Sequence, residues 1–264
     1  MGRPNPEPPV QAGAVDTHCH LFLIDREPSL VVEAARAAGV DRLICVGIDP
    51  ETSARSLELA DSIAGVFATA GMHPHEASSL DAAAGARIEE LLHDPRVVAV
   101  GECGLDYYRL RSPIEDQIRA LRLHIALSNE SGKPMVVHVR DAWEDALRVL
   151  DEGSAERVVF HCFSGDAAIA RGCVERGYWI SFAGNVTYPA NEHLREAART
   201  VDNDRLVVET DAPFLAPQRL RGRDNEPANV IDAIEAVARA RGEDVESVVE
   251  TTARNARAAF PGIG

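Results

Sequence analysis

The sequence is almost without lysine. Of its 27 basic residues Lys133 is the only lysine, so arginine carries nearly all of the positive charge. Acidic residues number 42, and the formal net charge is −15 at pH 7. Proteins that coat nucleic acid need a basic footprint to displace its counterions. The composition therefore excludes a protein that coats nucleic acid by charge alone, although it permits an enzyme that holds one or two phosphates through metal ions.

Long apolar runs and paired cysteines are also missing. No run reaches the roughly 18–20 apolar residues that cross a bilayer, so the sequence predicts no membrane segment. Residues 1–14 contain four prolines and no apolar core, which indicates a disordered tail and not a signal peptide. The five cysteines are scattered and lack CxxC spacing. This usage is typical of free thiols in a reducing compartment, and we expect a cytoplasmic protein.

Short β-branched apolar runs alternate with nine segments of helical periodicity after residue 14. Eight such alternations predict a single (β/α)8 barrel of the TIM type over residues 15–264. An open doubly wound sheet is the alternative, but it would not bring its first and last strands together. The predicted strands are 15–18, 42–47, 65–70, 97–101, 134–137, 158–160, 178–182 and 206–209.

Six metal-capable side chains lie at the ends of these predicted strands or directly after them. They are His18, His20, Glu102, His138, His161 and Asp211. Alternate residues of a strand face the same side, so both histidines of the HCH motif can point into the barrel mouth. An isolated pair of this kind is more often two ordinary hydrogen-bonded histidines. Six at strand ends predict a metal site at the carboxyl-terminal face of the barrel.

Four imidazoles and two carboxylates suffice for two divalent ions with positions left for water and substrate. Such a pair would activate a water and stabilise the attacking and leaving oxygens of phosphoester hydrolysis, while a single ion would leave some residues as acid or base. Glu102 can bridge two ions. Lys133 precedes a strand, so a bridging carbamylated lysine is not available. We predict that Asp211 orients or deprotonates the water and that Glu102 and Asp211 are the catalytic residues.

Several polar residues next to these six are candidate substrate contacts. They are His73, Tyr108, Arg109 and Arg140, with Arg221 and Arg223 as further sources of positive charge. Arginine forks suit phosphate, and an aromatic ring can stack on a base, although rim aromatics often serve packing alone.

Taken in chain order, the motifs around these residues resemble those of TatD-type metal-dependent deoxyribonucleases, which belong to the amidohydrolase-like barrel superfamily. The resemblance covers about residues 15–260, and its motifs are VDTHCHL, GMHPH, VGECGLDYYR, GKPMVVHVRDA, HCFSG, ISFAGNVT, VVETDAPFLAP and RGRDNEPANV. It implies one divalent ion on the residues matching His18, His20, Glu102 and Asp211, and a second on those matching Glu102, His138 and His161. Mg²⁺ or Mn²⁺ is implied as the working ion, with Zn²⁺ possible. The residue matching His73 is implied to lie near the substrate phosphate.

The resemblance also implies a function. The expected activity is 3′→5′ exonucleolytic hydrolysis of DNA, on single strands or 3′ ends, with no membrane and no obligate protein partner. A barrel amidohydrolase that cleaves a small-molecule or aminoacyl ester or amide is the alternative, because an activated water attacks carbonyl and phosphoryl centres alike. A metal-stabilised adaptor without activity is less favoured, because structural metal sites are normally closed by their own ligands.

Overall fold

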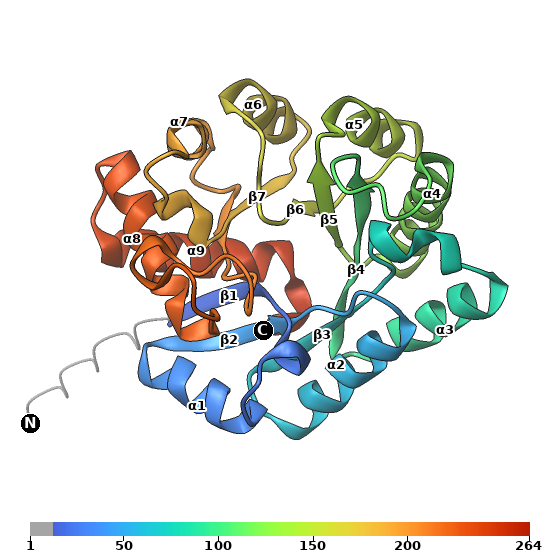
Figure 1. Ribbon diagram of the computed structural model, residues 1–264, viewed down its shortest axis with the longest axis horizontal. Coiled ribbons are helices and arrows are strands. Elements are labelled where there is room, and N and C mark those ends of the chain that lie inside the picture. Colours follow the sequence, from blue (N-terminus) through green and yellow to red (C-terminus); the bar gives the residue numbers. More distant parts are fainter. Residues whose placement is uncertain (1–12) are drawn as a thin grey trace, which may run out of the picture.

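The computed structural model describes residues 13–264, so most of the predicted tail of residues 1–14 lies outside the described residues. Eight strands form one parallel sheet in chain order, with the helices arranged around it (Figure 1). The strands are β1 (Ala14–Cys19), β2 (Val40–Cys45), β3 (Val66–Ala70), β4 (Val97–Asp106), β5 (Met135–Arg140), β6 (Val158–Phe160), β7 (Trp179–Phe182) and β8 (Leu206–Val208). The predicted (β/α)8 barrel is confirmed.

The sheet closes between β1 and β8. Cys19 forms a parallel bridge with Ala212, and the backbone N–H of Asp211 donates to the carbonyl oxygen of His18 at 2.9 Å. The Thr17 hydroxyl adds a bond to the Val208 carbonyl at 2.9 Å. Closure therefore brings the first and the last metal-capable segments of the chain side by side, which an open sheet would not do.

The nine predicted helical segments all form helices. They are α1 (Pro28–Ala37), α2 (Pro50–Ser62), α3 (Ala82–Leu92), α4 (Ile114–Ser131), α5 (Trp143–Glu152), α6 (Ala167–Glu175), α7 (Glu192–Thr200), α8 (Val230–Arg241) and α9 (Val245–Ala259). Local chemistry sets their ends. Asp49 accepts from the Thr52 backbone N–H and Thr52 bonds back to Asp49, a capping box that starts α2. Gly132 ends α4 in the left-handed conformation that favours glycine. None of the helices in residues 13–264 is long and apolar enough to cross a membrane.

Two apolar layers stabilise the barrel. The larger one lies between the sheet and the surrounding helices, as in other barrels. The smaller one fills the barrel interior with strand residues such as Val15, Val98 and Val207, packed with Phe260 and the residues of α9. These strand residues stand near the beginnings of their strands, so α9 covers the amino-terminal end of the interior. The carboxyl-terminal end is left for polar side chains.

The strand ends differ from the prediction at β4 and β5. Pairing between these strands continues as far as Asp106 opposite Arg140, so Glu102 and His138 lie inside strands and not at their ends. The predicted ends at residues 101 and 137 are therefore wrong. Close approach explains the extension: Gly104 has φ +136°, and a Cβ there would overlap the carbonyl oxygen of His138. Asp211, in contrast, lies three residues beyond β8.

The single lysine has a structural role at the opposite end of the barrel. The Lys133 ammonium group donates to the carbonyl oxygens of Leu92, Asp94 and Val97, and so ties the start of β5 to the α3–β4 loop. It lies away from the carboxyl-terminal face, as its place before a strand predicted.

Candidate active site

Glu102 lies at the centre of the cluster, with a different set of side chains at each carboxylate oxygen. Its Oε2 lies 3.4 Å from His18 Nε2 and 3.9 Å from His20 Nε2. The two histidine nitrogens are 3.3 Å apart, and Asp211 Oδ1 lies 3.6 Å from His20 Nε2 and 3.8 Å from His18 Nε2. The end of β1, the interior of β4 and the segment after β8 thus place two nitrogens and two carboxylates close together.

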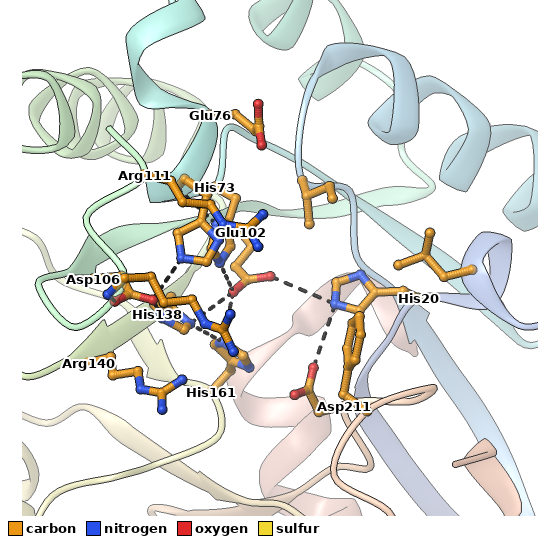
Figure 2. A pocket seen from close by; sticks show the side chains of 15 residues that line it. His20, His73, Glu76, Glu102, Asp106, Arg111, His138, Arg140, His161 and Asp211 are labelled. Carbon is orange, nitrogen blue, oxygen red and sulfur yellow. Dashed lines mark hydrogen bonds and ion pairs between the residues drawn. The ribbon is translucent and has the colours of Figure 1, made fainter. Parts of the chain in front are cut away.

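The other oxygen of Glu102 faces a second set of histidines from β3, β5 and β6. Its Oε1 lies 2.8 Å from His161 Nε2, 3.3 Å from His138 Nδ1 and 3.3 Å from His73 Nε2. Figure 2 shows Glu102 between these histidines on one side and His20 with Asp211 on the other. All six predicted residues are therefore together, and His73 lies within the cluster as well as facing the cavity.

The imidazoles of His20 and His161 are each oriented by a hydrogen bond at Nδ1, the ring nitrogen that faces away from Glu102. His20 Nδ1 lies 2.8 Å from the carbonyl oxygen of Val46, and since a carbonyl only accepts, this nitrogen must carry a hydrogen. His161 Nδ1 faces the Glu209 carboxylate at 3.2 Å in the same way. In neutral rings the Nε2 atoms then present lone pairs toward the oxygens of Glu102 and Asp211. The lone pairs of the imidazole nitrogens then face those of the carboxylate oxygens and repel them. Only a cation or a proton between these atoms stabilises that arrangement.

The pKa shifts of His161 and Glu102 agree with this need for a positive charge between them. Burial lowers the pKa of His161, but the Glu102 and Glu209 carboxylates outweigh burial and hold this pKa well above its usual range. Burial raises the pKa of Glu102, but His161 and His73 outweigh it and hold this pKa well below its usual range. The cluster therefore favours positive charge on His161 and negative charge on Glu102, whereas burial lowers the pKa of His18 and lowers that of His73 to about 4.

This donor chemistry fits a metal ion. Within the described residues, three sets of side chains place one ligand atom each within 4.8 Å of one another: His18 with His20 and Glu102; His73 with Glu102 and His138; and His18 with His161 and Glu209. Imidazole and carboxylate donors suit zinc, manganese and magnesium. The clusters are thus able to bind metal.

Asp16, on β1, supports the backbone of the cluster, and the sequence analysis did not identify it. Its buried carboxyl group accepts from the Thr210 N–H at 2.9 Å, the Thr210 hydroxyl at 2.6 Å and the His18 N–H at 3.3 Å. Burial raises the pKa of Asp16 to about 8. These bonds fix the backbone between Glu209 and Asp211 against β1.

Asp106 is a second supporting carboxylate that the sequence analysis missed. Its Oδ2 lies 2.8 Å from His75 Nε2 and 3.4 Å from His138 Nε2. Gln117 holds it in place by accepting from the Asp106 N–H at 2.7 Å and donating to the Asp106 carbonyl at 3.2 Å. A signal was present, because the two-residue period of a strand puts Asp106 on the same face as Glu102.

A cavity of about 340 Å³ opens over the cluster, and three arginines line it. None of these arginines (Arg109, Arg111 and Arg140) has a carboxylate within 4.0 Å among the residues that the structure describes. Arginines elsewhere on this acidic chain do form ion pairs with carboxylates. Arg111 was missed from the sequence, although it stands two residues after Arg109. Unpaired guanidinium groups around a polar cavity are suited to phosphate.

The other predicted substrate contacts lie farther out. Tyr108 is exposed at the rim, with the Arg140 guanidinium 4.0 Å from its ring centroid, and it is not among the residues lining the cavity. Arg221 packs over Tyr188 at 4.7 Å. Neither this cavity nor the adjoining one of about 560 Å³ is lined by Arg221 or Arg223.

His124, which is not one of the cluster ligands, should make the free energy of unfolding depend on pH. Its Nε2 accepts from the Met72 N–H at 2.9 Å and its Nδ1 donates to the Ala120 carbonyl at 2.6 Å. Burial lowers the pKa of His124 to about 4, so the folded protein keeps it neutral while the unfolded chain takes up a proton below about pH 6.5. The unfolded state binds more protons, and the free energy of unfolding must fall as the pH drops from about 6.5 toward 4.

We expect His124 to contribute about 2 kcal/mol to the loss of stability of metal-free protein between pH 7 and pH 5. Urea unfolding at both pH values measures it, with His124→Gln as the comparison. The variant should be less stable at pH 7 yet lose less stability on acidification. Equal pH dependence in the two proteins would contradict the neutral state of His124.

Comparison with known proteins agrees with this geometry. The family model described as TatD related DNase matches residues 15–261. A protein of Bacillus subtilis named uncharacterized metal-dependent hydrolase YabD is 38% identical over 93% of this chain and 98% of its own length. The 3′-5′ ssDNA/RNA exonuclease TatD of Erwinia amylovora is 37% identical over 90% of this chain and 95% of its own.

Solved structures extend the agreement to three dimensions. The crystal structure of YJJV, a TatD homolog from Escherichia coli, superposes with a TM-score of 0.89 at 27% identity, over 94% of this chain and 98% of that one. The family-model match over residues 15–261 includes every segment that contributes to the Glu102 cluster. On the family match, the relatives and the geometry together, this chain belongs to the TatD family of metal-dependent hydrolases.

Proposed function

We propose that this protein is a metal-dependent nuclease that removes nucleotides from the 3′ end of single-stranded DNA by hydrolysis of phosphodiester bonds. The observation that carries the proposal is the position of Glu102, whose two oxygens each face a separate set of histidine nitrogens. The name of the Erwinia amylovora relative supports the choice of substrate and direction, and it makes single-stranded RNA a second substrate to test.

The proposed cofactor is a pair of divalent ions. His18, His20 and Asp211 would hold one of them with Glu102 Oε2, and His138 and His161 would hold the other with Oε1. We propose Mg²⁺ or Mn²⁺ as the working ion, with Zn²⁺ as a further candidate for this mixed set of nitrogen and oxygen donors. When bound, such ions would activate a water and stabilise negative charge on the phosphoryl oxygens.

The chain's own residues divide the remaining work. Asp211 lies at the edge of the cluster facing the cavity, where its carboxylate can orient the attacking water and accept its proton. Glu102 is buried and faces histidines on both sides, so its part is to hold both halves of the site. Arg109, Arg111 and Arg140 would hold the substrate phosphate over the cluster. His73 would contact the phosphate from the β3 side.

The arginines also favour phosphodiesters over the carbonyl substrates of an amidohydrolase. A neutral ester or amide has no use for three unpaired guanidinium groups, whereas a nucleic acid strand presents one negative charge per nucleotide. We also propose a cytoplasmic location, because all five cysteines are free thiols.

The test is hydrolysis of single-stranded DNA by metal-stripped protein, with Mg²⁺, Mn²⁺ or Zn²⁺ restored separately. Labelling the 5′ end in one sample and the 3′ end in another gives the direction of shortening. We expect metal-dependent loss of nucleotides from the 3′ end only. Metal-dependent turnover of p-nitrophenyl acetate without any cleavage of DNA or RNA would favour the ester hydrolase instead.

A further inference from the structure

Phe214 is an exposed aromatic ring next to an otherwise polar site. The residue is 51% exposed, and its ring centroid lies 6.0 Å from that of His20, in an edge-on arrangement. Phe214 lines the cavity over the cluster and also the adjoining cavity, so its ring forms a shared wall. Half of the Phe214 side chain stays in water, so the ring is not needed to fill the hydrophobic core.

The backbone around this ring is held firmly. The Phe214 N–H donates to the Asp211 carbonyl at 2.8 Å, and the Phe214 carbonyl accepts from the Asn225 side chain at 2.9 Å. The same Asn225 amide donates to the Thr210 carbonyl at 2.9 Å, and the Asn225 N–H donates to the Pro213 carbonyl at 2.9 Å. Asn225 is buried. The ring is therefore presented to the cavities by a preorganised loop, which lowers the entropy cost of binding a flat ligand against it.

The adjoining cavity has the size and the chemistry for a nucleobase. Its volume of about 560 Å³ lies over the β6, β7 and α7 segments, within the range of small-ligand pockets. Leu194 and Leu215 contribute apolar wall, while Asn185, Asn191 and His193 contribute polar groups. The Asn185 side-chain amide has one long contact, 3.9 Å from its nitrogen to Cys162 Sγ, and its oxygen has no hydrogen-bond partner among the described residues.

The two cavities join where a phosphate would lie. Arg109, Arg140, His138, His161 and Asp211 line both of them. A phosphate held over the cluster by these arginines would have its adjacent sugar and base directed toward one cavity or the other. An aromatic wall at that junction offers the kind of surface on which single-strand binding proteins stack bases.

We propose that the cavity over β6, β7 and α7 is a nucleobase subsite, in which Phe214 stacks on the base next to the scissile phosphate and Asn185 contacts the edge of that base. The subsite rests on the proposed nuclease function and adds to it a requirement for a base beside the cleaved bond. Stacking is tolerant of sequence because every base has an aromatic face. The subsite should therefore bind any base, and a strand that lacks the base at this position should bind more weakly.

The test uses single-stranded oligonucleotides that are either natural or carry an abasic site at the last or the next-to-last 3′ position. Initial rates of first cleavage give kcat and KM for the wild-type protein, Phe214→Ala and Phe214→Tyr. Leu110→Ala is the matched control, because Leu110 is an equally exposed apolar residue at 52% that lines neither cavity. Metal content and thermal unfolding of each variant are measured alongside.

We expect Phe214→Ala to raise KM for the natural strand about 5- to 100-fold, with metal content unchanged and with Phe214→Tyr and Leu110→Ala near wild type. One abasic position should weaken wild-type binding to a similar degree and leave Phe214→Ala unaffected. Two results would overturn the subsite while leaving the nuclease function in place, provided that the wild-type protein shortens the strand. Either Phe214→Ala keeps the wild-type KM, or its KM rises equally for natural and abasic strands. If the wild-type protein shortens no strand, the proposed function fails and the subsite fails with it.

Discussion

Asp211→Asn should reduce hydrolysis by about 10²- to 10⁴-fold and leave the barrel folded. The substitution keeps the size and shape of the side chain but removes the negative charge that lies 3.6 Å from His20 Nε2. An asparagine cannot accept a proton from the attacking water, and it is a weaker ligand beside His18 and His20. Burial raises the pKa of Asp211, but its bond to His20 and the charge of His18 outweigh burial and lower it, so the wild-type residue is ionised at neutral pH.

Steady-state cleavage of single-stranded DNA measures this effect, with circular dichroism and thermal unfolding as checks on the fold. Asp61→Asn, on the exposed face of α2, is the matched control for loss of one surface charge and should behave as wild type. Turnover of Asp211→Asn within a few-fold of wild type would remove Asp211 from the reaction and leave the choice of proton acceptor open to another group.

Glu102→Gln should have the larger effect on metal binding. Because Glu102 contacts both halves of the cluster, removal of its charge should weaken both metal positions, whereas Asp211→Asn should weaken only the position beside His18 and His20. Loss of residues that merely orient metal ligands typically weakens binding about 10- to 100-fold, so loss of a shared ligand should exceed that range. We expect Glu102→Gln to retain little metal after dialysis and to show no rise in melting temperature when Mn²⁺ is added.

Elemental analysis and thermal unfolding with and without Mn²⁺ test this expectation. Glu76→Gln is the control, because the Glu76 side chain lines the same cavity and has no ion pair within 4.0 Å among the described residues (Figure 2). Retention of one full equivalent of metal by Glu102→Gln would show that Glu102 serves one position and does not bridge two.

Much of this architecture is predictable because it depends on local patterns. Segment 114–131 has the periodicity of an amphipathic helix and forms α4 with those bounds. The six candidate residues lie in the carboxyl-terminal halves of strands or shortly after them, and in a parallel barrel these positions converge at one face whatever the intervening helices contain. His18, Glu102 and Asp211 therefore lie together, although more than 80 residues separate each from the next.

Pairing and packing decided the rest. Glu102 lies inside β4 because the backbone of Gly104 lets β5 approach, and no single-strand pattern shows how far two strands pair. Asp106 and Gln117 support His138 through contacts across β4, β5 and α4. By sequence Arg221 and Arg223 were as suitable for phosphate as Arg109, yet they do not line the cavity over the cluster.

The sequence by itself determined the barrel and its metal-capable residues, because strand and helix periods are local properties of the chain. The order of its motifs determined the resemblance to a hydrolase family. Only the tertiary structure decided which oxygen of Glu102 faces which histidines, which arginines stay unpaired and where Phe214 stands. These are distances between segments remote in sequence, and barrel closure and loop packing set them.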